Sequence, residues 1–128
     1  MMWNTTNMVV DHNGSPRHKL YKGKMANLLR SVGFKAAGDN DDEFAITRHE
    51  SENPYYVDVC ASNDTRDLVI EIHGYEGHNS RRRILHDKNR ANEIKALVHN
   101  IEYYEFSFWQ LKDFEEMTPY ILEELGIA

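Results

Sequence analysis

The sequence predicts a small α/β or α+β fold, in which helices flank a mixed β-sheet and a further helix closes the chain. Three observations predict it. The chain has 128 residues, a usual length for one domain with a single core. Stretches with helical spacing of apolar residues alternate with stretches rich in β-branched and aromatic residues. A helical stretch also separates the last two strand-like stretches, which predicts that those two strands run parallel.

Helical spacing occurs in three segments. In residues 17–32 the apolar residues recur at helical intervals, and Gly33 follows where a helix C-cap belongs. Residues 80–99 have the same periodicity. Residues 110–125 are amphipathic, and we expect Pro119 to kink or divide that last helix.

Strand-like segments fill the intervals between the helices. Two short candidates, 34–38 and 43–49, flank an acidic turn. The segments 55–62 and 67–74 are rich in β-formers and are joined by the turn "NDTR". Residues 101–108 form the last strand. With the two short candidates counted together, the predicted order is helix, three strands, helix, strand, helix.

Composition and charge exclude several classes of protein. Hydrophobic residues make up 41% and charged residues 28%, as in soluble globular proteins, and the formal net charge of -6 argues against a protein that coats nucleic acid. Cys60 is the only cysteine, so neither an intrachain disulfide nor a zinc site of several cysteines is available. The N-terminus does not resemble a signal peptide, and no segment is apolar enough to cross a membrane. We expect a soluble cytoplasmic protein without membrane contact, with a flexible tail at 1–16 and one domain at 17–128.

Two acidic residues face each other in the predicted hairpin. Symmetric pairing about the turn "NDTR" sets Cys60 opposite Val69 and Asp58 opposite Glu71, and alternation puts both acids on one face with His73. Opposed residues have Cβ atoms about 5 Å apart, where two carboxylates repel unless a cation or a shared proton lies between them. A solvated sheet face is the alternative. The apolar alternate positions of residues 68–73 instead indicate a central strand.

The predicted helix 80–99 contributes a further acid and a basic patch. The buried stripe of this helix is predicted at Ile84, Ala91, Ile94 and Val98. Helical steps from Ile84 pass through Asp87, which places Asp87 on the same core-facing stripe, although a local ion pair is an alternative. With His78, Asp87 would form a second layer above the acidic pair. Several cations could hold the phosphates of a phosphodiester substrate, or could simply line solvated helix faces: Arg81, Arg82, Arg83, Lys88 and Arg90, extended from the first helix by Lys22 and Lys24.

These residues resemble the PD-(D/E)xK nuclease superfamily. Its restriction-endonuclease-like αβββαβ core carries an Asp on one strand and Glu-x-Lys on the next, here Asp58 and Glu71-Ile72-His73. The stretch "IEIHGYEGH…HDKNR" is similar to the branch that includes very-short-patch repair and EDxHD-type homing endonucleases. The resemblance spans residues 19–108. Two features depart from it, namely His73 in place of Lys or Asp and the lack of an acid in the first helix.

The resemblance implies an endonuclease that acts on DNA and depends on Mg²⁺ or Mn²⁺. Three groups would hold the metal: Asp58, Glu71 and the main-chain carbonyl of Ile72. His73 or His78 would orient the attacking water, take its proton or stabilise the leaving oxygen, and Asp87 would fix His78 or contribute to a second metal position. A single small domain makes one nick at a time, so cutting both strands would need a homodimer.

Three alternatives stay open. The chain could have kept the nuclease fold without its chemistry and could bind nucleic acid or a protein partner, as His73 and the acid-free first helix favour. "His86-Asp87" and the His/Asn clusters are similar to HD phosphohydrolases and HNH nucleases, but the strands and the spacing contradict both. The acids could also belong to a core or surface without a site. The remaining histidines are expected at the surface: His12, His18, His49 and His99.

Overall fold

A four-stranded mixed sheet forms the centre of the computed structural model, with the strand order β2-β5-β6-β7. The strands are Lys35–Ala37 (β2), Val59–Ser62 (β5), Asp67–His73 (β6) and Ile101–Ser107 (β7). β2, β5 and β6 pair antiparallel, whereas β6 and β7 pair parallel. The crossover between β6 and β7 contains helix α2, Arg81–Leu97. The predicted α+β class and the predicted parallel pair are therefore confirmed.

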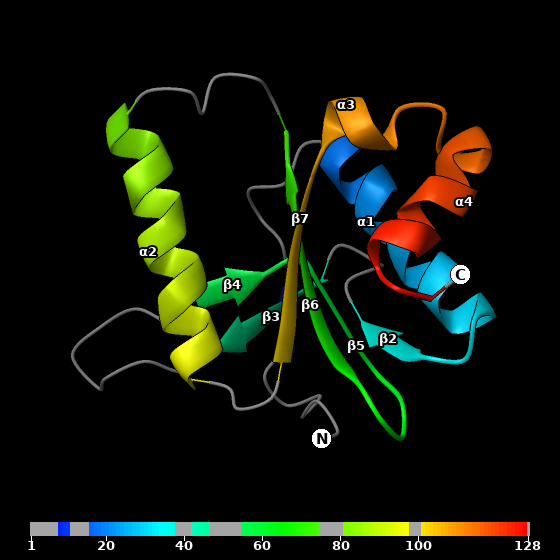
Figure 1. Ribbon diagram of the computed structural model, residues 1–128, viewed down its shortest axis with the longest axis horizontal. Coiled ribbons are helices and arrows are strands. Elements are labelled where there is room, and N and C mark those ends of the chain that lie inside the picture. The colour runs from blue at the N-terminus through cyan, green and yellow to red at the C-terminus, as the bar shows by residue number, and fades with distance from the viewer. Residues whose placement is uncertain are drawn as a thin grey trace.

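Helices cover both faces of this sheet (Figure 1). Helix α1, Pro16–Ser31, lies on one face together with α3, Phe108–Leu111, and α4, Phe114–Glu124, while α2 lies on the other. Among the described helices, none has the length and apolar character needed to span a bilayer. The structure describes the backbone of residues 8–10, 16–37, 42–46, 55–74, 81–97 and 101–127, and side chains in 16–37, 56–74, 88–96 and 101–127.

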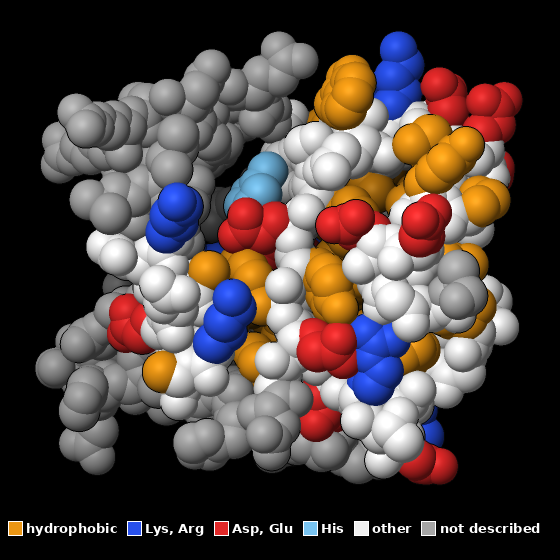
Figure 2. All heavy atoms as spheres, in the orientation of Figure 1, with side chains coloured by type: hydrophobic (Ala, Val, Ile, Leu, Met, Phe, Trp, Pro, Cys, Tyr) orange, Lys and Arg blue, Asp and Glu red, His pale blue; other side chains and the backbone are white. Residues whose placement is uncertain are grey.

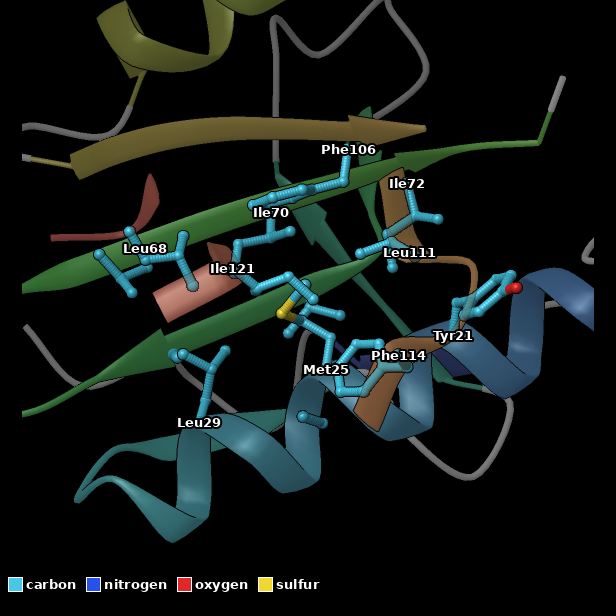
Figure 3. Packing of buried hydrophobic residues seen from close by; sticks show 14 of the residues in the cluster. Tyr21, Met25, Leu29, Leu68, Ile70, Ile72, Phe106, Leu111, Phe114 and Ile121 are labelled. Carbon is cyan, nitrogen blue, oxygen red and sulfur yellow. The ribbon is translucent and has the colours of Figure 1, made fainter. Parts of the chain in front are cut away.

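The larger hydrophobic core lies between the sheet and the α1 side of the molecule (Figure 3). Period-2 alternation sends every second side chain of β6 toward α1, and helical spacing brings one stripe of α1 to meet them. The residues at the centre of this core are Met25 and Leu29 of α1, Leu68, Ile70 and Ile72 of β6, and Leu111, Phe114 and Ile121 of the C-terminal helices. This packing fixes α1 against β6, which carries the candidate site.

A smaller core lies under α2. Ile94 is fully buried there against Val57, Cys60 and Val69. Ala91 is also buried, so the predicted core-facing stripe of this helix is confirmed at Ala91 and Ile94. The side chains of the other two stripe positions, Ile84 and Val98, are outside the described residues.

The segment 55–62, expected as one strand, is two strands. Tyr55–Val57 (β4) belongs to a second sheet with the order β1-β3-β4, and β5 belongs to the main sheet. The chain bends at Asp58 between them. The two other strands of the second sheet are Met8–Val10 (β1) and Asp42–Ile46 (β3). The apolar residues Met8–Val10 in the expected N-terminal tail thus form a strand, and the flexibility of the tail stays a prediction.

The C-terminal helix is divided, but at Asp113 and not at Pro119. Asp113 has a left-handed backbone with φ of 55°, which interrupts the helix between α3 and α4. Pro119 lies inside α4. Ser107 and Gln110 form a capping box at the start of α3, in which the Ser107 hydroxyl accepts from the Gln110 amide and the Gln110 side chain accepts from the Ser107 amide. This box fixes the turn from β7 into α3.

Candidate functional site

Asp58 is a buried carboxylate held by the neighbouring strand. Its Oδ2 accepts a hydrogen bond of 2.7 Å from the main-chain amide of Ile72, and the residue is 6% exposed. The β5–β6 register follows the predicted pairing, with Cys60 opposite Val69, but the ladder ends at Val59 opposite Ile70. The bend therefore takes Asp58 out of the ladder and turns its side chain toward the end of β6.

His18 completes this arrangement from helix α1. Its Nε2 lies 3.2 Å from Asp58 Oδ1 and 3.0 Å from the main-chain oxygen of Ile72. The prediction that His18 lies at the surface is wrong, since its side chain is 17% exposed. Helical spacing could have revealed that His18 faces the core, because steps of four, three and four residues back from Leu29 pass through Met25 and Lys22 to His18.

Asp58 is the main group that raises the pKa of His18. Burial lowers the pKa of His18, and the buried Lys22 one turn further along α1 also lowers it. The hydrogen bond and the charge of Asp58, with the Ile72 carbonyl, outweigh both, so the pKa of His18 lies above its ordinary value. Both neighbours of Nε2 are acceptor oxygens, so Nε2 donates toward them, at the place that a cation would take.

Glu71 lies in a separate contact with helix α2. Its Oε2 accepts from Arg90 Nη1 at 3.0 Å, and Arg90 Nη2 donates to the main-chain oxygen of Tyr56 at 2.7 Å. Burial lowers the pKa of Arg90, but the charge and hydrogen bond of Glu71 and the charge of Asp58 raise it by more, so the guanidinium stays charged. Glu71 is 6% exposed, so this pair is well shielded from water.

His73 is more exposed than Asp58 and Glu71, and its side chain contacts Glu105 of β7. Its Nε2 lies 3.8 Å from Glu105 Oε2, and the side chains are 29% and 42% exposed. The interaction with His73 lowers the pKa of Glu105. Figure 2 shows a histidine directly next to acidic side-chain atoms on the face of the molecule in this view. A carboxylate in this position can orient the imidazole ring for proton transfer.

The prediction that Asp58, Glu71 and His73 share one face is wrong for Asp58. Asp58 contacts α1, which covers one face of the sheet, whereas Glu71 contacts α2, which covers the other. The cause is the bend at Asp58, which shifts the alternation of side chains between the two faces of the sheet. As a result Val57 packs in the smaller core with Cys60, whereas Val59 packs in the larger core. Two of the three expected metal donors, Asp58 Oδ1 and the Ile72 carbonyl, thus converge on one point.

The third expected donor, Glu71, is not brought to that point by any contact described above. Among the described side chains, no group of three His, Cys, Asp or Glu residues is arranged to hold a metal ion. The side chains of His78 and Asp87 are outside the described residues, so their predicted roles stay predictions. The donor set seen here is one carboxylate, one carbonyl and one imidazole.

The basic residues expected to contact phosphates fall into four groups. Lys22 is fully buried, so its expected place on an exposed basic strip is wrong. Lys24 is paired with Glu115 of α4, and Arg90 with Glu71, which leaves both engaged within the fold. Lys88 is exposed. The side chains of Arg81–Arg83 are outside the described residues, and their contact with DNA stays a prediction.

A hollow of 430 Å³ lies elsewhere, at the C-terminal helices. It is lined mainly by aromatic and aliphatic side chains, among them Phe106, Trp109, Tyr120 and Ile121. Its lining shares no residue with the polar cluster of Asp58, His18 and Glu71. The converging polar groups and this apolar hollow are therefore separate features.

Comparison with known proteins adds little to this description. No protein-family model matches the chain, and no curated protein matches it. A solved structure, titled as that of a protein of unknown function, AF1548, is similar with a TM-score of 0.47 and 15% identity. The similarity covers 71% of this chain and 46% of that one, so this chain spans less than half of its length. Similarity at this level supports no functional argument.

Proposed function

We propose that this chain is a metal-dependent endonuclease that hydrolyses phosphodiester bonds in DNA. The observation that carries the proposal is the convergence of Asp58 Oδ1 and the Ile72 carbonyl on one point, which His18 Nε2 now holds. Carboxylate and carbonyl oxygens are the ligands that Mg²⁺ and Mn²⁺ take in proteins. The αβββαβ order of the main sheet and its helices, which the resemblance above shares, supports the same reading.

In this proposal, different residues would bind the metal ion and take the proton of the attacking water. A bound Mg²⁺ or Mn²⁺ would polarise the scissile phosphate and lower the pKa of the attacking water. Asp58 and the Ile72 carbonyl would hold the ion, with the Ile72 amide fixing the Asp58 carboxylate. Glu71 would join them after exchanging its contact with Arg90. His73 would take the proton of the water, with Glu105 orienting the ring.

The test is the nicking of supercoiled plasmid DNA with Mn²⁺ or Mg²⁺. We expect Asp58→Asn and Glu71→Gln to lower the nicking rate by about a hundredfold or more, because each removes a charge that serves the metal site. Asp64→Asn is the matched control, since Asp64 is exposed in the β5–β6 turn and should keep the wild-type rate. Circular dichroism establishes that the variants are folded.

Two outcomes count against the proposal. A wild-type protein that is inactive on duplex, single-stranded and branched DNA and on RNA would rule out the nuclease function. Nicking retained in both Asp58→Asn and Glu71→Gln would keep a nuclease but place its site elsewhere.

A second candidate is a nuclease-fold module that binds nucleic acid or a protein and performs no chemistry. The observation that favours it is the tight engagement of Glu71 with Arg90, which occupies an expected metal ligand. Calorimetry separates the two candidates. Binding of DNA with no binding of Mn²⁺ or Mg²⁺ would support the inactive module, whereas metal binding that depends on Asp58 would support the enzyme.

Cleavage of both strands would need two copies of this single small domain. We propose a homodimer for that case, with one site acting on each strand. Sedimentation with and without a short DNA duplex tests it, because a dimer on DNA should carry two chains for each duplex. One chain for each duplex, together with nicking only, would mean that the protein acts as a monomer.

A further inference from the structure

We propose that His18 is itself a metal ligand and that its nitrogen makes the site select a first-row transition ion, such as Mn²⁺ or Co²⁺, over Mg²⁺. The inference rests on the proposed function, since it takes Asp58 and the Ile72 carbonyl as metal donors. It adds a ligand from α1, a helix in which the sequence offered no acidic residue for the site.

The distances at His18 fit metal coordination. Nε2 lies 3.2 Å from Asp58 Oδ1 and 3.0 Å from the Ile72 oxygen. Two ligands about 2.1–2.2 Å from an ion and at right angles to each other are about 3.0 Å apart. The nitrogen and each oxygen are therefore separated like neighbouring corners of an octahedron, before any movement of the chain.

The same geometry lets a metal ion take the place of the proton on His18 Nε2. The Nε2 proton now points at both oxygens, so an ion entering between the three atoms takes the place of that proton. The proton leaves to solvent, and the neutral imidazole binds through the Nε2 lone pair with its remaining proton on Nδ1. Asp58 stays ionised and keeps its hydrogen bond from the Ile72 amide through Oδ2.

The position of the ring is set by the fold. The first turn of α1 carries His18, and the buried residues Met25 and Leu29 lock the helix onto β6. The ring lies 6.2 Å from that of Phe108, tilted by 39°, and its side chain is 17% exposed. A ligand held in place in this way loses little conformational entropy on binding.

The choice of metal follows from the nitrogen. Mg²⁺ prefers an all-oxygen octahedron and binds imidazole poorly, whereas transition ions accept imidazole and carboxylate together. The three groups seen here are one nitrogen and two oxygens. Water or phosphate oxygens would fill the other positions on the ion.

The experiment measures affinities for Mn²⁺ and Mg²⁺ without DNA, by calorimetry and by the spin-resonance signal of free Mn²⁺. We expect wild type to bind Mn²⁺ at least about tenfold more tightly than Mg²⁺. His18→Gln should weaken Mn²⁺ binding about tenfold or more and leave Mg²⁺ binding nearly unchanged. His18→Asp, which makes the donor set all oxygen, should shift the preference toward Mg²⁺.

The control is Asp64→Asn, a change of an exposed side chain in the β5–β6 turn that takes no part in the proposed site. It should keep the wild-type ratio of Mn²⁺ to Mg²⁺ affinity. The ratio is the deciding readout, because a loss of folded protein lowers binding of both ions equally.

Three outcomes would overturn the inference: an unchanged ratio in both His18 variants, an equal change of the ratio in Asp64→Asn, or a wild-type protein that binds neither ion. Plasmid nicking that depends on Asp58 tests the proposed function separately. If nicking needs Asp58 while the metal preference does not depend on His18, the nuclease stands and the ligand assignment fails.

Discussion

Arg66 joins three parts of the chain that are far apart in sequence. Its Nε and Nη2 donate to the two carboxylate oxygens of Glu102 on β7, at 2.6 and 2.7 Å, and Nη2 also donates to the main-chain oxygen of Leu125 at 2.6 Å. Such a two-point contact between a guanidinium and a carboxylate is directional and stronger than a neutral hydrogen bond. Arg66 therefore ties the start of β6 to β7 and to the end of α4.

This pair predicts how stability depends on pH. The hydrogen bond from Arg66 is the main cause that lowers the pKa of Glu102 below its ordinary 4.5. A lowered pKa means stabilisation that is present above pH 4.5 and is lost as pH falls through the pKa of the folded state. Urea unfolding should show Glu102→Gln less stable than wild type at pH 7, with a smaller difference at pH 3.

The control for that measurement is Glu123→Gln, a change of an exposed carboxylate in α4. Its effect on the unfolding free energy should be small and similar at both pH values. A Glu102→Gln difference that is equal at pH 7 and pH 3 would mean that the ionised pair does not stabilise the fold.

At the scale of elements, helix α1 positions His18 and ends in a motif that requires glycine. Gly33 has φ of 96°, its amide donates to the Arg30 oxygen, and the Phe34 amide donates to the Leu29 oxygen. These two bonds form a Schellman motif, and Phe34 is buried in the same core as Leu29. The motif turns the chain from α1 into β2.

Two alanine substitutions in this helix should have opposite signs. Gly33→Ala should lower the free energy of unfolding by about 1 kcal/mol, because a side chain is disfavoured at positive φ. Gly23→Ala should raise it by about 0.5–1 kcal/mol, because alanine favours the helix interior. Neither added Cβ meets an atom within 4 Å, so packing does not confuse the comparison. Urea unfolding measures both, and effects of the same sign would contradict this account of the helix end.

Local patterns predicted most of the elements but not the break within residues 55–62. The helices over 17–32 and 80–99 follow from spacing, and so does the register that sets Cys60 opposite Val69. The bend at Asp58 does not follow, because Tyr55, Tyr56, Val57 and Val59 on both sides of Asp58 favour a strand. The bend is stabilised by a bond to the Ile72 amide, fourteen residues away, which strand periodicity does not encode.

At the scale of the whole molecule, the packing of α1 on the sheet decides which groups meet. Sequence patterns predict Asp58 and the Ile72 carbonyl as metal donors but not His18, since the distance from α1 to β6 depends on the core between them. Lys22 was misplaced for a related reason, because charge patterning treats a lysine as exposed, whereas the core here encloses it completely. Long-range packing therefore sets the content of the candidate site.

The most direct test of the central claim is a crystal of the protein soaked in Mn²⁺, with an anomalous difference map recorded at the manganese edge. We predict one strong peak bonded to Asp58 Oδ1 and the Ile72 carbonyl, with His18 Nε2 about 2.2 Å from the ion. An empty map between these three atoms, in crystals of a protein that nicks DNA with Mn²⁺, would contradict the account.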